Sequence, residues 1–384
     1  MRGEGADVVI VGGGVIGCAL ARELALRGAA VTVIERAEPG AEASGAAAGL
    51  LAPQAEGLAR GPFFDLALES RRLYPAWTAQ LAEESGMEVG YRKAGILRCT
   101  LPGSATERNA FAWQRRAGLA VEDKNAGEIA ALTGGSVSEE IREAIFFPDE
   151  AVVDNRRLTR ALWVAAERRG VEFAIGRTAR RFLIRGGRCA GVETDQGPVA
   201  GAQVINAAGA WASFDPEFPV PVEPVHGQIV EVESPAPTLA TVVESDEVYI
   251  VPRGGSWLLG STVERIGFEK RVTAGAVGRL IAAAARLLPS LEGAAFRRAW
   301  SGLRPGTPDG MPVLGRCPLP GLFLAAGHFR NGILLAPVTA LAIAECLDGS
   351  GARDLSPFAI GRFPESSCDI SGKAGRPARI QSVS

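Results

Sequence analysis

The first 35 residues constrain the fold most strongly, because they follow the pattern of a βαβ unit. The apolar run "DVVIV" leads into a glycine-rich turn, the helix-forming stretch "VIGCALARELALRG" and a second apolar run, "AVTVIE". Two short strands joined through a helix lie parallel in one sheet. The sequence therefore predicts an α/β domain built on a parallel sheet.

The turn inside this unit carries the pattern GxGxxG, formed by Gly12, Gly14 and Gly17, and Glu35 ends the second strand. In a dinucleotide site the first glycine permits the tight turn, the second lets a pyrophosphate approach the backbone, and the third lets the helix pack on the strand. The acidic residue accepts hydrogen bonds from ribose hydroxyls. The alternative is a glycine-rich turn in a fold that binds no nucleotide. The motif alone does not choose between NAD and FAD.

Two further segments are rich in small residues, which let a backbone press against a flat ligand. The first is "AEASGAAAGLLAPQAEG", residues 41–57, for which a mobile linker is the alternative. The second is "GAQVINAAGAWA", residues 201–212, which predicts a buried strand that ends in small residues and Trp211. Both are candidates for contact with a nucleotide.

Near the C-terminus, "GHFRNGILLAP" places polar residues immediately before an apolar run that predicts a helix from about Ile333. The first turn of a helix has free N–H groups and partial positive charge, so it can stabilise an anionic group. The alternative is an ordinary helix that packs on the sheet. In "GLRPGTPDG", Arg304 is expected in a rigid turn, where its guanidinium could hold a carboxylate through two hydrogen bonds. The alternative there is a surface charge.

Composition narrows the function classes. The 384 residues are 47% hydrophobic, with 41 Lys and Arg against 43 Asp and Glu, so two domains are expected and no basic field that would hold nucleic acid or an anionic membrane. No later apolar run reaches membrane-spanning length, and Glu4 and Asp7 argue against an export signal. Six dispersed cysteines indicate reduced thiols and no metal site. We therefore expect a cytoplasmic protein.

Beyond these separate motifs, the sequence resembles the FAD-dependent amino-acid oxidases, the family that includes D-amino acid oxidase and sarcosine oxidase, and within it glycine oxidase of thiamine biosynthesis. The resemblance runs in family order from about Asp7 to Leu347. The matching stretches are "VVIVGGGVIGCALARELALRG", "SGAAAGLLAPQAEG", "VINAAGAW", "EVYIVPR", "WSGLRPGTPDGMPVLG" and "LFLAAGHFRNGILLAPVTALAIAECL".

The resemblance implies an α/β, Rossmann-like FAD-binding domain of the GxGxxG type, with an inserted antiparallel β substrate domain. We expect the FAD-binding domain at 1–88, 150–221 and 320–352, and the substrate-binding domain at 89–149 and 222–319. Residues 353–384 are expected to form a loose C-terminal tail.

The resemblance also implies roles for individual residues. Arg304 and Tyr249 would hold the amino-acid carboxylate, and Arg330 would be a second positive group near the substrate. The cofactor would contact Gly12, Gly14, Val15, Ile16, Gly17, Glu35, Arg36, Ala43, Ser44, Ala48, Gly49, Leu50, Arg180, Ala208, Gly209, His328, Arg330, Asn331, Gly332, Ile333 and Leu334. Leu50 stands where some glycine oxidases have Met, and the match around Arg180 is poor.

The implied reaction is hydride transfer from the substrate Cα to flavin N5, with the amine entering as the neutral base. The imine product would hydrolyse to glyoxylate and ammonia or pass onward, and dioxygen would reoxidise the flavin to give hydrogen peroxide. The segment "SGLRPGT" lacks the cysteine to which some relatives attach flavin covalently, so noncovalent FAD is expected.

Three function classes remain open on the sequence. The first is an oxidase of glycine, sarcosine or small D-amino acids, with dioxygen as its second substrate. The second is a flavin D-amino acid dehydrogenase that passes electrons to a quinone. The third is an NAD-dependent dehydrogenase or a noncatalytic dinucleotide-binding module. Homo-oligomer formation is left open.

Overall fold

The predicted βαβ unit is present at the start of the chain. The computed structural model describes residues 6–103, 109–233, 239–351 and 353–363. Strand β1 (Ala6–Val11) and strand β2 (Val31–Glu35) pair in parallel, and helix α1 (Val15–Leu26) joins them. The Val and Ile side chains of both strands are buried, as their sequence predicts.

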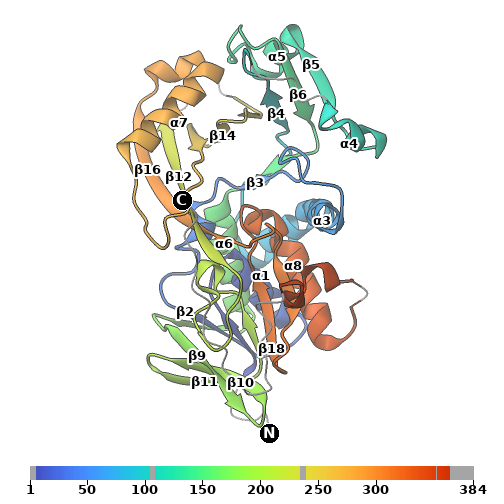
Figure 1. Ribbon diagram of the computed structural model, residues 1–384, viewed down its shortest axis with the longest axis vertical. Helices are drawn as coiled ribbons and strands as arrows, with labels where there is room; N and C mark the ends of the chain where they lie inside the picture. The colour runs from blue at the N-terminus through green and yellow to red at the C-terminus, as the bar shows by residue number, and fades with distance from the viewer. Residues whose placement is uncertain (1–5, 104–108, 234–238, 352, 364–384) are drawn as a thin grey trace.

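The first sheet has eight strands and mixed directions. Its β11, β1, β2, β8 and β18 pair in parallel, β17 adds antiparallel to β18, and β9 and β10 extend β11 as an antiparallel meander. The bounds not yet given are β8 (Glu172–Ile175), β9 (Ala179–Arg185), β10 (Arg188–Thr194), β11 (Gly197–Asn206), β17 (Val313–Arg316) and β18 (Leu322–Ala326). The meander forms the lower end of the molecule in Figure 1.

Helices cover one face of this sheet. They are α1, α3 (Pro62–Ser85), α6 (Asn155–Arg168) and α8 (Gly332–Asp348), and they share one apolar core with the sheet. Helix α1 packs between α6 and α8. The capping side chain of Asp154 starts α6 by accepting from the N–H groups of Arg156 and Arg157. These contacts fix the N-termini of α1 and α8 at the same edge of the sheet.

The second sheet also has eight strands, in the order β16-β12-β15-β14-β13-β4-β6-β5. Their bounds are β4 (Ile96–Cys99), β5 (Glu122–Asn125), β6 (Glu143–Phe147), β12 (Glu223–Glu233), β13 (Val242–Glu244), β14 (Tyr249–Arg253), β15 (Ser256–Gly260) and β16 (Phe296–Gly306). The pairing of β4 with β13 is parallel, and the others are antiparallel. The sheet was expected to be antiparallel throughout, and the parallel pairing of β4 with β13 is the exception. The two strands come from distant parts of the chain, so no hairpin imposes an antiparallel order on them.

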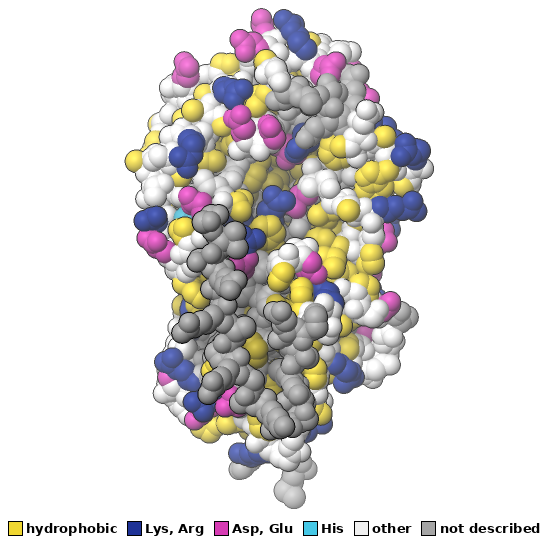
Figure 2. All heavy atoms as spheres, in the orientation of Figure 1, with side chains coloured by type: hydrophobic (Ala, Val, Ile, Leu, Met, Phe, Trp, Pro, Cys, Tyr) yellow, Lys and Arg dark blue, Asp and Glu magenta, His cyan; other side chains and the backbone are white. Residues whose placement is uncertain are grey.

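This second sheet lies above the first in Figure 1, with α7 (Ala274–Leu287) at one end and α5 (Ala126–Thr133) with α4 (Ala112–Arg116) at the other. The short strands β3 (Leu50–Leu51) and β7 (Ala151–Val152) pair between the two layers. On the face drawn in Figure 2, Lys and Arg side chains are interspersed with Asp and Glu, without a large patch of either sign among the described residues.

The end of the described chain differs from the loose tail expected over 353–384. Residues 353–363 pack on the protein: Phe358 and Ile360 are buried, and Arg353 forms an ion pair of 2.6 Å with Glu69. Phe358 and Ile360 pack into the hydrophobic core of the protein. The sequence did not predict this, because the segment as a whole is polar. Residues 364–384 lie outside the described residues.

Candidate active site

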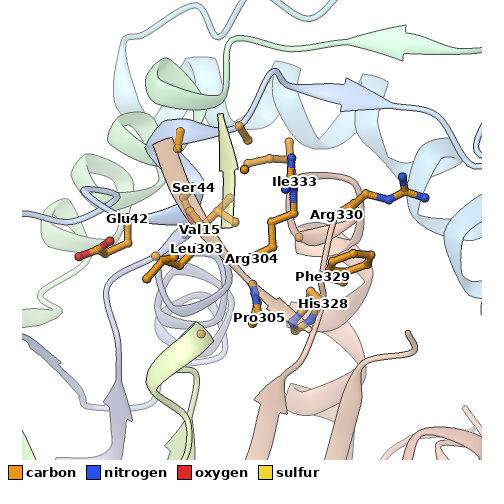
Figure 3. A pocket seen from close by; sticks show the side chains of 18 of the residues that line it. Val15, Glu42, Ser44, Leu303, Arg304, Pro305, His328, Phe329, Arg330 and Ile333 are labelled. Atoms are coloured by element: carbon orange, nitrogen blue, oxygen red, sulfur yellow. Dashed lines mark hydrogen bonds between the residues drawn. The ribbon is translucent and has the colours of Figure 1, made fainter. Parts of the chain in front are cut away.

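One cavity of about 540 Å³ lies between the two sheets and reaches from the glycine-rich turn to the start of α8. Most of the predicted site residues line it, from both ends of the sequence. They are Gly12, Gly14, Val15, Ile16, Glu35, Arg36, Ala43, Ser44, Ala48, Gly49, Leu50, Ala208, Gly209, Tyr249, Arg304, His328, Arg330, Gly332 and Ile333. Figure 3 shows Val15 and Ser44 in one part of the cavity and Arg304, Arg330 and Ile333 in another.

The glycine-rich turn and the start of α1 form one wall of the cavity. The N-terminus of α1 points there, and the hydroxyl of Ser44 accepts from the N–H of Val15 at 2.9 Å. A Cβ at Gly12 would lie 2.5 Å from the carbonyl oxygen of Ala207, and one at Gly17 would lie 1.8 Å from that of Gly12. Gly17 does not line the cavity and serves helix packing. The positive end of the α1 dipole and the close approach that the glycines allow suit a phosphate group at this wall.

Glu35 also belongs to this wall. One carboxylate oxygen accepts from the N–H of Gly13 at 2.7 Å and the other from Ala37 at 2.8 Å. A carboxylate has about four lone-pair sites, so both oxygens keep capacity for ribose hydroxyls. Nearby, the guanidinium of Arg36 stacks 3.6 Å from the ring centroid of Trp211. This flat pair lines the cavity and suits the adenosine part of a dinucleotide.

Arg180, predicted on this wall, does not line the cavity. Its side chain is 61% exposed, and its guanidinium lies 4.0 Å from Asp195. The wall is formed by the preceding residues Arg177, Thr178 and Ala179 instead. Alternation along β9 turns Arg180 away from the side to which Ala179 points.

At the other end, the first turn of α8 meets the cavity through Gly332 and Ile333. The N–H groups of a first helical turn have no partner within the helix. Asn331 and Leu334, which were predicted beside them, do not line the cavity. The amide of Asn331 donates to Glu56 at 3.2 Å, and Leu334 is buried with its carbonyl accepting from Ser70.

His328 is buried at this end, and its Nε2 lies 3.1 Å from the hydroxyl of Thr339. Burial lowers the pKa of His328 from its ordinary value of 6.5 to about 3. The imidazole is therefore neutral at physiological pH. Positive charge near this end comes from the start of α8 and from Arg330 and Arg304, not from His328.

The lowered pKa predicts a pH dependence of stability. Below pH 6.5 His328 is protonated in the unfolded chain, whereas in the folded protein it stays neutral down to about pH 3. The free energy of unfolding therefore decreases as the pH falls below 6.5. Between pH 7 and 5 the loss from this group is about 2 kcal/mol. Urea unfolding with saturating FAD at both pH values would measure it. His328→Gln should show a correspondingly smaller loss, and an equal loss in both proteins would contradict the prediction.

Arg304 lies in strand β16 rather than in the rigid turn expected from its sequence. It pairs with Val225 of β12, and Pro305 pairs with Pro224. Strand β16 is the edge of its sheet, where a proline without an N–H is tolerated. The guanidinium donates from Nη1 to the carbonyl of Thr262 at 3.1 Å and from Nη2 to the hydroxyl of Ser261 at 2.6 Å.

Both of these partners are uncharged, so they orient the guanidinium without neutralising it. Burial lowers the pKa of Arg304, but an arginine remains protonated under ordinary conditions. Tyr249 is a neighbour in the same wall, and burial raises its pKa, so its phenol keeps the proton. Together they present one positive charge and one hydroxyl to the cavity.

Two glycines that were not predicted make room for these side chains. A Cβ at Gly227 would lie 2.1 Å from Nη1 of Arg304, and one at Gly260 would lie 2.4 Å from the hydroxyl of Tyr249. A glycine inside a strand often marks a place where another group approaches the backbone closely. The glycines in "VHGQIV" and "WLLGS" could therefore have been predicted to lie beside such a group.

Glu56 is a further cavity residue that sequence reasoning missed. Its carboxylate lies 3.8 Å from Arg330 and accepts from the amide of Asn331. Burial raises the pKa of Glu56, while Arg330, Asn331 and Arg304 oppose that shift. The available signal was that Glu56 is one of only two carboxylates, with Glu42, in a segment (41–57) of mostly small residues.

Neither metal chemistry nor a membrane span is indicated by the part of the chain that the structure describes. It contains no group of three or more His, Cys, Asp or Glu side chains that could hold a metal ion. In the same residues, no helix is both long and apolar enough to cross a bilayer.

Comparison with known proteins agrees with this geometry. Residues 7–346 match the DAO family, described as FAD dependent oxidoreductase. The bifunctional protein ThiO/ThiG of Trichormus variabilis is 39% identical over 353 residues, covering 88% of this chain and 52% of its own length. The chain thus spans about half the length of that relative.

Two comparisons cover nearly the whole of both chains. Glycine oxidase of Geobacillus kaustophilus is 38% identical over 370 residues, covering 93% of this chain and 97% of its own. The crystal structure of glycine oxidase from Geobacillus kaustophilus superposes with a TM-score of 0.87 at 36% identity and covers 93% and 99% of the two chains. The chain therefore belongs to the DAO family of FAD-dependent oxidoreductases.

Proposed function

We propose that this protein oxidises glycine and other small amino acids, such as sarcosine and small D-amino acids, to their imines. The observation that carries the proposal is that Arg304 and Tyr249 line the same cavity as the start of α8. We call these two residues the carboxylate clamp. The similarity to glycine oxidases supports the choice of substrate.

Each part of the cavity has a proposed task. The start of α1 and Glu35 hold the pyrophosphate and ribose, with Arg36 beside the adenosine. The start of α8, through Gly332 and Ile333, would stabilise negative charge on the bound cofactor. FAD, when bound, accepts the hydride from the substrate Cα and passes electrons to dioxygen, giving hydrogen peroxide.

The clamp orients the amino acid. A guanidinium and a phenol hold the carboxylate by two or more hydrogen bonds and so fix which face of the Cα meets the cofactor. Arg330 adds positive charge near the substrate, moderated by Glu56. The hydrolysed imine would yield glyoxylate and ammonia.

The proposal also includes the division into domains, the pathway and the cellular location. The FAD-binding domain consists of 1–88, 150–221 and 320–352, and the inserted, largely antiparallel domain of 89–149 and 222–319 covers the substrate. The cavity lies where these parts meet. We propose a role in forming the thiazole of thiamine, which the similarity to ThiO/ThiG supports, and a cytoplasmic location. Self-association is compatible with the proposal.

The FAD is proposed to be noncovalent, because no cysteine is among the described residues that line the cavity. The purified protein should be yellow and release intact FAD on acid or heat denaturation. Flavin that stays attached to the denatured chain would contradict this assignment.

One spectroscopic experiment tests the reaction. Anaerobic addition of glycine should bleach the flavin absorbance, and admitting air should restore it rapidly with release of hydrogen peroxide. Bleaching without rapid reoxidation would favour the dehydrogenase that reduces a quinone. Absence of bleaching by glycine, sarcosine and small D-amino acids would overturn the proposal.

A further inference from the structure

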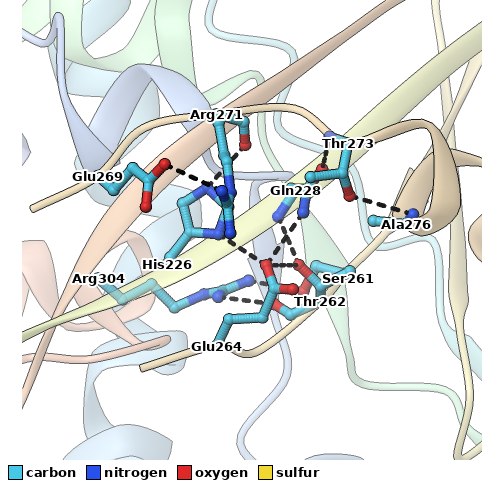
Figure 4. Close-up of polar contacts among 10 residues, drawn as sticks. All are labelled: His226, Gln228, Ser261, Thr262, Glu264, Glu269, Arg271, Thr273, Ala276 and Arg304. Carbon is cyan, nitrogen blue, oxygen red and sulfur yellow. Dashed lines mark hydrogen bonds and ion pairs between the residues drawn. The ribbon is translucent and has the colours of Figure 1, made fainter. Parts of the chain in front are cut away.

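A cluster of hydrogen-bonded polar side chains lies next to the carboxylate clamp and has no role in the proposed reaction. The partners of Arg304, Ser261 and Thr262, belong to a short segment, 261–264, that runs beside β12. Glu264 ends this segment and pairs through its backbone with His226, in both directions, at 2.8 and 2.9 Å. Figure 4 shows Arg304 on one side of the segment and His226 and Gln228 on the other.

Three donors converge on one oxygen of Glu264. Its Oε2 accepts from Nδ1 of His226 at 2.8 Å, from the amide of Gln228 at 3.0 Å and from the hydroxyl of Thr262 at 3.4 Å. The hydrogen bond from Gln228, followed by that from His226, lowers the pKa of the Glu264 carboxyl. The carboxylate is thus ionised and acts only as an acceptor.

His226 is fully buried, and its other ring nitrogen lies 3.0 Å from the carbonyl oxygen of Arg271. A carbonyl cannot donate, and neither can an ionised carboxylate. The two ring nitrogens of His226 thus face two acceptors, one on each side of the ring. The ring is held between the side chain of Glu264 and the backbone of Arg271.

The same cluster is tied to the next helix. Gln228 accepts through its side-chain oxygen from the N–H of Thr273 at 2.8 Å, and the hydroxyl of Thr273 caps α7. Side-chain alternation along β12 places His226 and Gln228 on this side and Gly227 under the guanidinium of Arg304. The 261–264 segment therefore has one face on the clamp and the other on a hydrogen-bonded cluster formed by His226, Gln228 and the start of α7.

We propose that Glu264, fixed by His226, is a positioning residue of the carboxylate clamp: it holds Ser261 and Thr262 where they orient the guanidinium of Arg304. The inference rests on the proposed function, in which Arg304 binds the substrate carboxylate. Glu264 itself does not contact the substrate.

The test compares Glu264→Ala, Glu264→Gln and a matched control, Glu269→Ala, in the FAD-bound protein. Glu269 lies in the same loop, but its described partner is the side chain of Arg271, so its loss leaves the clamp intact. For glycine, Glu264→Ala should raise KM about tenfold or more, the equivalent of a hydrogen bond to a charged group, with kcat changed less than about twofold. Glu264→Gln keeps an acceptor oxygen and loses only charge, so its KM should rise about threefold.

A double-mutant cycle separates positioning from general weakening of the structure. In an Arg304→Ala background, Glu264→Ala should have no further effect on the KM for glycine, because there is no guanidinium left to orient. Acetate, a carboxylate without an amine, gives a second readout through its perturbation of the flavin spectrum. Its dissociation constant should rise with the same ranking.

The outcomes distinguish the two proposals. If Arg304→Ala raises KM but both Glu264 variants match the control, the positioning role is overturned and the proposed function stands. Equal effects of Glu264→Ala with and without Arg304 would also overturn it. If Arg304→Ala leaves glycine kinetics unchanged, the part of the proposed function that assigns the substrate carboxylate to Arg304 fails, and the positioning role of Glu264 fails with it. Should the Ala variant not fold, a wild-type KM in Glu264→Gln decides against the inference.

Discussion

Arg304→Ala should lower kcat/KM for glycine by roughly thirtyfold to several thousandfold, because removing one member of a desolvated charge pair costs about 2 to 5 kcal/mol. The effect should appear mainly in KM if the guanidinium holds the carboxylate equally in the ground and transition states. The flavin spectrum should remain near that of the wild type. Steady-state kinetics with glycine, together with the absorbance of bound FAD, measures both.

Two controls sharpen this result. Arg304→Lys should rescue poorly, since an ammonium cannot reproduce the paired donors that reach Ser261 and Thr262. Gly227→Ala leaves the arginine in the sequence but places a Cβ 2.1 Å from its Nη1, so the flexible side chain must move and KM for glycine should rise without loss of FAD. Unchanged glycine kinetics in Arg304→Ala would place the clamp elsewhere, with Arg330 and Tyr249 next to test.

Local patterns predicted the nucleotide-binding half of the fold well. The period and length of the first apolar runs, the glycines between them and Glu35 all act within one βαβ unit, so neighbouring residues determine the structure. The parallel pairing of β4 with β13 was not predictable in the same way. It depends on where two distant segments enter the sheet, and no turn between them records their direction.

In the candidate site, too, features set by neighbouring residues were predicted and features set by distant segments were not. Residues identified by motif, such as Gly12 and Ile333, line the cavity. Arg304 lines the cavity, but the sequence predicted a turn at this position because Pro and Gly follow it. The structure has a strand there, and its proline is tolerated because β16 is an edge. Glu264 and His226 carry no motif at all. Their importance arises from a three-dimensional hydrogen-bond cluster that sequence spacing does not encode.

Gly14→Val should yield a folded but colourless protein. In the protein itself a Cβ at Gly14 would meet only the hydroxyl of Ser44, at 3.2 Å, so the chain can accommodate a side chain with a small shift. Its branches would instead occupy space that the proposed pyrophosphate needs beside the start of α1. Overpacking costs about 1 to 3 kcal/mol, and lost contacts with the helix N-terminus add to it, so FAD affinity should fall on the order of a hundredfold or more.

Comparison with other glycines separates cofactor loss from misfolding. Gly17→Ala would place a Cβ 1.8 Å from the carbonyl oxygen of Gly12, so it should destabilise the fold with or without FAD. Gly278 lies on the exposed side of α7, where an added Cβ would have no described heavy atom within 4 Å, so Gly278→Val should bind FAD as the wild type does. Titration of each apoprotein with FAD, followed by flavin fluorescence, gives the dissociation constants, and circular dichroism reports folding. A Gly14→Val protein that retains wild-type FAD affinity would mean that the pyrophosphate does not lie against this turn.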